Sequence, residues 1–176
     1  MKKRQQIILI EGIPDSTKVL FTEHLSKILK LPIISVYTGV CSKNASSVYF
    51  EDVDFFQFFA NLIRDQSFDC IIVDSYLSRA VFALFNQVSV TAYDLMLDSF
   101  FTDNRINFKL LYFVSSLARL KQQIAKTDSD FDFEECSELQ ALYEHFLTNN
   151  PLPFMRLHNG STINIVEVCD FIAKGE

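Results

Sequence analysis

The sequence contains few cysteines, no tryptophan, and little glycine or proline. Its four cysteines are widely separated, without the close pairs that zinc sites and redox dithiols use: Cys41, Cys70, Cys136 and Cys169. We therefore expect a reduced, cytoplasmic protein. Only four glycines and four prolines occur among 176 residues, and no repeat or low-complexity tract suggests a linker. This length and composition predict a single domain over residues 1–176.

Long apolar runs and positive charge are also scarce. The apolar run Ile7–Ile10 is far shorter than the ~20 residues that cross a bilayer, and Glu11 interrupts it. We therefore expect no membrane partner. The formal net charge is -6, and Lys2–Arg4 is the only basic run. A chain with this charge distribution is not expected to bind duplex nucleic acid.

Short apolar runs alternate with segments of helical spacing along the chain. Strands are expected at residues 7–10, 33–37, 68–74, 108–114 and 154–157. Helices are expected at residues 18–30, 50–64, 77–85, 92–101, 116–126, 134–148 and 163–173. Because each parallel strand needs a crossover before it, this order predicts an α/β fold with a doubly wound, mostly parallel five-stranded sheet and helices on both faces. Ligands of such sheets bind beyond the carboxyl ends of the strands, which points to the turns after Ile10 and Asp74.

The turn after the first strand partly matches a phosphate-binding pattern, G-x-x-x-x-G-K-[ST]. Gly12 and Lys18 match the first glycine and the lysine. Thr17 replaces the second glycine, and Val19 replaces the hydroxyl residue. A β-branched Thr17 resists a positive φ, and Val19 cannot place a hydroxyl on magnesium. The match lies between a predicted strand and a predicted helix, which is the context that the pattern requires.

Simpler interpretations of these residues stay open. The turn can be a plain one, in which Ser16 or Thr17 caps the helix and Lys18 is solvated. Asp74 ends a buried strand at the ligand edge, where a carboxylate either serves function or caps the next helix. The phenylalanines of residues 55–59 could stack on a base, although clustered Phe on a helix is usually core. No residues with the spacing of metal ligands are evident, and the acidic residues 127–132 suit a solvated loop.

Two segments resemble the thymidylate kinases and related deoxynucleoside and nucleoside monophosphate kinases. Ile7–Pro32 resembles the family's opening, in which a buried strand leads through Glu-Gly into the P-loop and its helix. Phe68–Phe82 resembles the strand that ends in an Asp-Arg pair, although Ser75 stands where the family has the arginine. The later elements follow the family in order. The resemblance implies a P-loop kinase fold with a lid-like segment at about 121–134, and a protein that can form a homodimer.

The resemblance also implies roles for individual residues. The phosphate-binding residues would be Gly12, Asp15, Ser16, Thr17 and Lys18, joined by Lys126 from the lid. The catalytic residues would be Lys18 on the donor phosphates, Asp74 orienting the acceptor or metal, and Arg79 reaching into the space of the missing arginine.

Two functions are compatible with these residues. One is a divergent kinase that uses ATP and Mg²⁺ to phosphorylate a (deoxy)nucleotide or nucleoside. The other is a catalytically inactive relative that binds a nucleotide or another protein. The missing arginine, magnesium ligand and loop glycine each remove a contribution to the transition state of phosphoryl transfer rather than to the fold.

Overall fold

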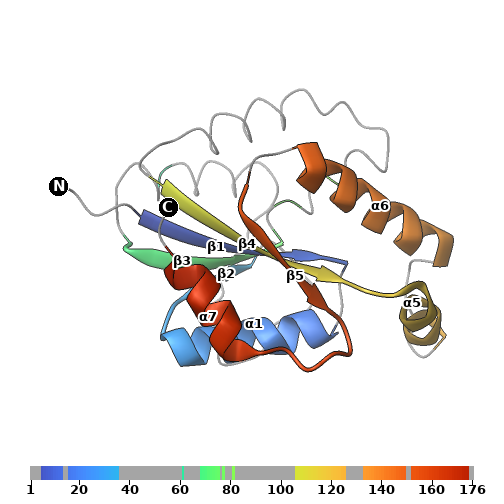
Figure 1. Ribbon diagram of the computed structural model, residues 1–176, viewed down its shortest axis with the longest axis horizontal. Helices are drawn as coiled ribbons and strands as arrows, with labels where there is room; N and C mark the ends of the chain where they lie inside the picture. Colours follow the sequence, from blue (N-terminus) through green and yellow to red (C-terminus); the bar gives the residue numbers. More distant parts are fainter. Residues whose placement is uncertain are drawn as a thin grey trace.

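The computed structural model describes residues 5–13, 16–35, 61, 68–75, 77, 81, 106–125, 133–149 and 152–174. These residues form a five-stranded sheet whose strands are β1 (Gln5–Gly12), β2 (Ile33–Ser35), β3 (Cys70–Asp74), β4 (Ile106–Val114) and β5 (Phe154–His158). The helices are α1 (Ser16–Leu29), α5 (Leu117–Ile124), α6 (Phe133–Asn149) and α7 (Ile165–Ala173), shown in Figure 1.

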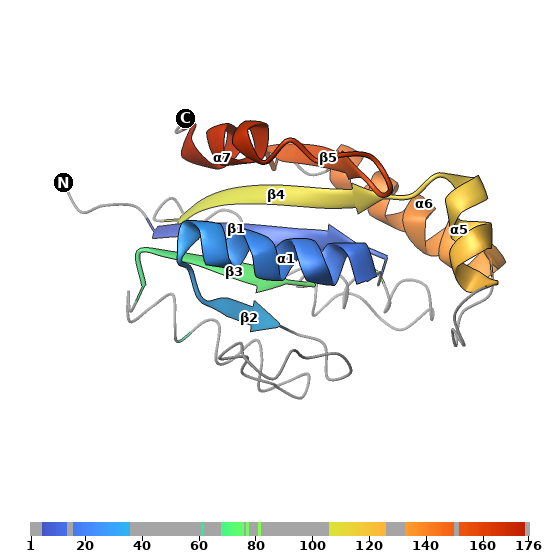
Figure 2. The same ribbon diagram turned by 90° about the horizontal axis from the view of Figure 1, so that it is seen from below.

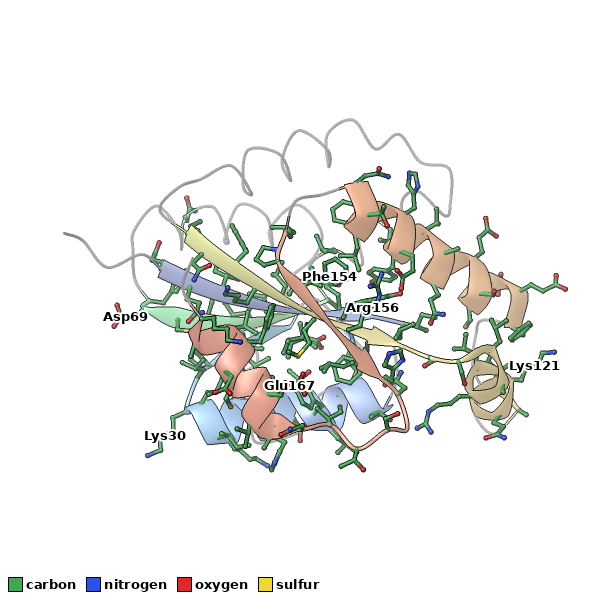
Figure 3. The ribbon with its side chains drawn as sticks, viewed as in Figure 1. Lys30, Asp69, Lys121, Phe154, Arg156 and Glu167 are labelled. Carbon is green, nitrogen blue, oxygen red and sulfur yellow. The ribbon has the colours of Figure 1, made fainter. Side chains whose placement is uncertain are left out.

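The strands lie in the order β2-β3-β1-β4-β5, and every neighbouring pair is parallel. Strand β1 is therefore central. Its Ile10 pairs with Asp74 of β3 on one side and with Leu111 of β4 on the other. This register brings the turn after β1 and the turn after β3 together at one edge of the sheet. Figure 2 shows the strand arrows pointing to that common edge.

Alternate residues of β1 face two separate cores. Ile7 and Leu9 pack on one side with a group that includes Leu139 and Tyr143 of α6. Ile8 and Ile10 pack on the other side with Phe21, Leu25, Val168 and Ile172, which belong to α1 and α7. Figure 1 accordingly shows α6 on one face of the sheet, and α1 and α7 on the other. A strand that is apolar on both sides needs helices over both faces, which is why these four residues form a continuous apolar run.

The expected α/β fold is confirmed in the described residues. All five expected strands are present, and all are parallel; β1 and β4 extend beyond the expected bounds. The helices expected at 18–30, 116–126, 134–148 and 163–173 correspond to α1, α5, α6 and α7. The helices expected at 50–64, 77–85 and 92–101 lie outside the described residues, apart from single positions. The assignment of all 176 residues to one domain stays a prediction.

No helix in the described part of the chain is both long enough and apolar enough to span a bilayer.

Gly12 ends β1 in a conformation that other residues rarely adopt. Its φ is 128°, and a Cβ built on it overlaps the backbone carbonyl oxygen of Phe113 in β4. The turn can therefore leave the central strand close to its neighbour only with glycine at this position.

We predict that Gly12→Ala lowers the free energy of unfolding by ~2–3 kcal/mol, because the obstructing carbonyl belongs to a central strand and cannot move aside. Gly160→Ala is the matched control. Gly160 also has a positive φ, of 85°, but there the new Cβ meets the guanidinium of Arg119, which is a side-chain end and not backbone. The loss of unfolding free energy in Gly160→Ala should therefore be only ~1 kcal/mol. Urea denaturation measures the free energy of unfolding of both variants. Equal losses in Gly12→Ala and Gly160→Ala would contradict this explanation of the Gly12 turn.

Candidate functional site

Three polar side chains meet where β1 and β3 end. The ammonium nitrogen of Lys18, in the first turns of α1, lies 3.0 Å from Oδ1 of Asp74, the last residue of β3. The same ammonium donates a hydrogen bond to Oγ of Ser75. The Ser75 hydroxyl in turn donates to Asp74 Oδ1 over 2.9 Å. Lys18, Asp74 and Ser75 therefore form a closed network, which we call the lysine triad.

The lysine triad is buried. The side chain of Lys18 is 2% exposed and that of Asp74 is 13% exposed. A buried charge is stable only when it is paired and hydrogen-bonded, and the two partners provide this for the ammonium. The interpretation of Lys18 as a solvated lysine is therefore wrong. The helix begins directly beside the central strand, so Lys18 lies at the sheet edge, whereas Leu20 of the same helix is exposed.

Ser75 holds its hydroxyl in place through an unusual backbone conformation. Its φ is 64°, in the left-handed region that residues with a Cβ seldom occupy, and the residue is fully buried. Its backbone N-H donates to the carbonyl oxygen of Ile10 over 2.9 Å, which ties the turn to the end of β1. Backbone strain of this kind is most common at functional sites.

Glu11 is a site residue that the sequence reasoning missed. It is fully buried at the end of β1, and its Oε1 accepts a hydrogen bond of 2.7 Å from the backbone N-H of Leu77. The carboxylate therefore joins the end of the central strand to the turn that follows Ser75. The sequence did give one signal for Glu11. It directly follows the apolar run Ile7–Ile10, and an acidic residue there is costly to bury without a partner.

Thr17 lies in the first turn of α1, and Lys30 and Ser75 are the only described residues other than glycine with a positive φ. Thr17 therefore does not adopt the positive φ that a β-branched residue resists, because the helix already begins at Ser16. Of the other predicted loop residues, Gly12 closes β1 and Ser16 opens α1.

The remaining predicted site residues lie outside the described part of the chain. They are Asp15, Arg79 and Lys126, together with Pro14 of the loop and the four phenylalanines of residues 55–59.

A second polar cluster lies at the same sheet edge, after β4 and β5. Asn159 donates through Nδ2 to Ser115 Oγ over 2.7 Å, and Gln140 of α6 bonds both backbone groups of Ser115 at 3.0 Å. Within the described residues, Arg119 Nε and Asn159 Oδ1 are buried polar atoms without a hydrogen-bond partner. The Arg119 guanidinium also lies where a side chain on Gly160 would be. We call Arg119, Asn159 and Gly160 the arginine cluster.

The arginine cluster was also missed by the sequence reasoning. The sequence did contain one signal for it, because Ser115 directly follows the buried strand β4 and Asn159 directly follows the edge strand β5. Native proteins leave few buried polar atoms unpaired, so the two unpaired atoms of this cluster are candidates for contact with a ligand.

Tyr112 of β4 is a buried titratable group whose pKa differs from that of a free tyrosine. Burial raises its pKa well above the usual value, the charge of Glu144 raises it further, and Arg156 opposes this. Its ring packs on Tyr143, with 5.7 Å between the ring centroids. The phenol therefore stays neutral at physiological pH, and the side chain is part of the hydrophobic core.

The solved structures that are similar to this chain include kinases and a protein found with a nucleotide. No protein-family model matches the chain, and no curated protein sequence matches it. The structure is similar to the YorR protein of Bacillus subtilis, solved in complex with phosphorylated GDP, with a TM-score of 0.66, 20% identity and 94% of each chain covered.

Two further similar structures are named as kinases. Deoxyadenosine kinase from M. mycoides, solved with dCMP and dCDP, has a TM-score of 0.53, 17% identity and 94% of each chain covered. Thymidylate kinase from Ehrlichia chaffeensis has a TM-score of 0.51 and 13% identity, over 96% of this chain and 95% of that one. This chain has the fold of the P-loop nucleotide and nucleoside kinases. The resemblance inferred from the sequence is thus confirmed for the fold, while the roles of individual site residues stay predictions.

Within this kinase fold, Ser75 is fully enclosed at the position where the sequence resemblance places an arginine. The Ser75 hydroxyl contacts both Lys18 and Asp74 at this position. The difference at position 75 is therefore part of how the lysine triad is built.

The lysine triad yields a prediction about stability. Lys18→Met and Asp74→Asn should each lower the free energy of unfolding by ~3–5 kcal/mol, because each single change leaves a buried group without its partner. The double variant should lose at least ~1 kcal/mol less than the sum of the single losses. Chemical denaturation of the four proteins completes this double-mutant cycle.

The exposed pair of Arg156 and Glu144, whose atoms Nη2 and Oε2 lie 2.6 Å apart, is the matched control. Because solvent screens its charges, its coupling energy should stay below ~1 kcal/mol. Strictly additive losses for Lys18 and Asp74 would show that the two side chains do not interact in the folded protein.

Proposed function

We propose that this chain binds a nucleotide at the carboxyl edge of the sheet, with Lys18 contacting its phosphates. The observation that carries the proposal is the buried ammonium of Lys18, placed at the start of the helix that follows the central strand. Parallel sheets of this kind bind ligands beyond the carboxyl ends of their strands. The start of a helix adds backbone N-H groups and a positive dipole end, both of which favour an anion.

The arginine cluster is our candidate for the nucleoside end of the ligand. Strands β1 and β5 are separated by β4, so their ends are about 10 Å apart, which one nucleotide can span. A planar guanidinium can stack on a base, and the unpaired Asn159 Oδ1 can accept a hydrogen bond from it. The likeness to YorR, solved with a phosphorylated GDP, supports a phosphorylated nucleoside as the ligand class.

Phosphoryl transfer from ATP to a (deoxy)nucleotide or nucleoside is the second candidate function. The pairing of Lys18 with Asp74 favours it, because a kinase needs a cation for the donor phosphates and a carboxylate close by. The folds of deoxyadenosine kinase and thymidylate kinase support the same reaction class. Against it stands Ser75, which cannot supply the charge of an arginine to the transition state. A homodimer and a cytoplasmic location also stay proposals.

Nucleotide titration tests the proposed binding. ADP, ATP, GDP and GTP are added to the protein, and thermal unfolding and isothermal titration calorimetry are recorded. A nucleotide at a hundred times its Kd should stabilise the fold by ~2.7 kcal/mol. The failure of every nucleotide to bind would contradict the proposal.

Two pairs of variants locate the binding site. Lys18→Met should weaken binding at least ~10-fold, the value of a hydrogen bond to a charged group, while Lys27→Met, at an exposed position of the same helix, should not. Arg119→Ala should weaken binding about tenfold, whereas Lys121→Ala on the same helix should have little effect. Equal effects within either pair would place the ligand elsewhere. Release of ADP that depends on an acceptor and disappears in Lys18→Met would instead favour the kinase.

A further inference from the structure

Magnesium is the metal that kinases of this fold bring to their nucleotides, so its fit to this site can be tested on the residues present. Mg²⁺ takes oxygen ligands such as carboxylates, hydroxyls and phosphates. At this sheet edge, Asp74 Oδ1 and Ser75 Oγ are oxygens of that kind, 2.9 Å apart. Both already contact one cation, the ammonium of Lys18. The chain's own ammonium thus occupies the position that a metal bound to these two oxygens would need.

The ammonium is held firmly at this position. Lys18 is 2% exposed and contacts both Asp74 and Ser75, so its side chain would lose two buried contacts on moving into solvent. A metal on Asp74 Oδ1 would have to displace Lys18, and a metal elsewhere on the carboxylate would lie beside the positive charge of Lys18. Val19, where the phosphate-binding pattern has a hydroxyl ligand, offers no oxygen to offset that repulsion. These residues do not fit a magnesium ion.

We infer that this site binds its nucleotide without a divalent cation, and that the Lys18 ammonium neutralises the Asp74 carboxylate in place of the metal. The inference rests on the proposed nucleotide binding and narrows it to the metal-free nucleotide. An ammonium carries three hydrogens and can therefore donate to more than one oxygen at once. Lys18 can thus contact a phosphate while it stays at the carboxylate, whereas a metal-nucleotide complex would bring its cation toward the ammonium.

The first test measures metal binding without any nucleotide. Mn²⁺, which has the ligand preference of Mg²⁺ and an electron paramagnetic resonance signal, is titrated into the wild type and three variants. The wild type and Asp74→Asn should bind Mn²⁺ equally, because Lys18 already occupies the carboxylate. Lys18→Met should gain a Mn²⁺ site, and Lys18→Met/Asp74→Asn should lose it again. Circular dichroism confirms that each variant is folded.

The wild type alone can overturn the inference in this test. A Mn²⁺ site in the wild-type protein that disappears in Asp74→Asn would show that the carboxylate takes a metal in the presence of Lys18. This comparison does not depend on whether Lys18→Met folds.

The second test measures ADP affinity by calorimetry in buffer with magnesium and in buffer with EDTA. The Kd should be no higher in EDTA than in magnesium, because the site binds the metal-free nucleotide and Mg²⁺ withdraws part of the ADP as its complex. Binding in magnesium alone would overturn the inference and leave the proposed function intact. An absence of binding in both buffers would overturn the proposed function, and the inference with it.

Discussion

The contact between the Lys18 ammonium and the Asp74 carboxylate is the interaction on which this sheet edge depends. Each charge would be costly to bury alone, so each requires the other. Their meeting in turn requires that β1 and β3 be neighbours and that α1 begin close to the end of β1. Gly12 permits that close turn, Ser75 completes the contact with its hydroxyl, and Glu11 fixes the turn behind it. The residues of the candidate site are therefore the same ones that fix the ends of the central strands and the start of α1.

The fold could be predicted largely from the sequence, because the strands β1, β3 and β4 are buried on both faces and therefore form apolar runs. The run from Ile7 to Ile10 carries no polar residue, so it is either a central strand or a buried helix segment. The Glu-Gly turn follows after only four apolar residues, which are too few for a helix. The first and last residues of the strands were less predictable. Strand β1 includes the polar residues Gln5, Gln6 and Glu11, whose burial depends on partners distant in sequence, such as the carbonyl oxygens of Phe68 and Ile172.

The site was predictable only in part. Lys18 and Asp74 could be chosen because both lie at the carboxyl ends of strands or just after them, and a parallel sheet brings those ends together. The roles of Ser75 and Arg119 were out of reach, since a left-handed φ and an unpaired guanidinium nitrogen arise from tertiary contacts. The pattern alone also gave no backbone conformation for Thr17, which lies inside α1 because the helix begins at Ser16.

The central claim is that phosphates bind at Lys18 while its contact with Asp74 persists. The most direct measurement is a crystal structure of the protein with ADP. The account predicts a phosphate oxygen within hydrogen-bond distance of Lys18 Nζ, the Lys18–Asp74 contact intact, and the base against Arg119. Phosphates bound away from Lys18, or a metal ion coordinated by Asp74 with Lys18 displaced, would contradict it.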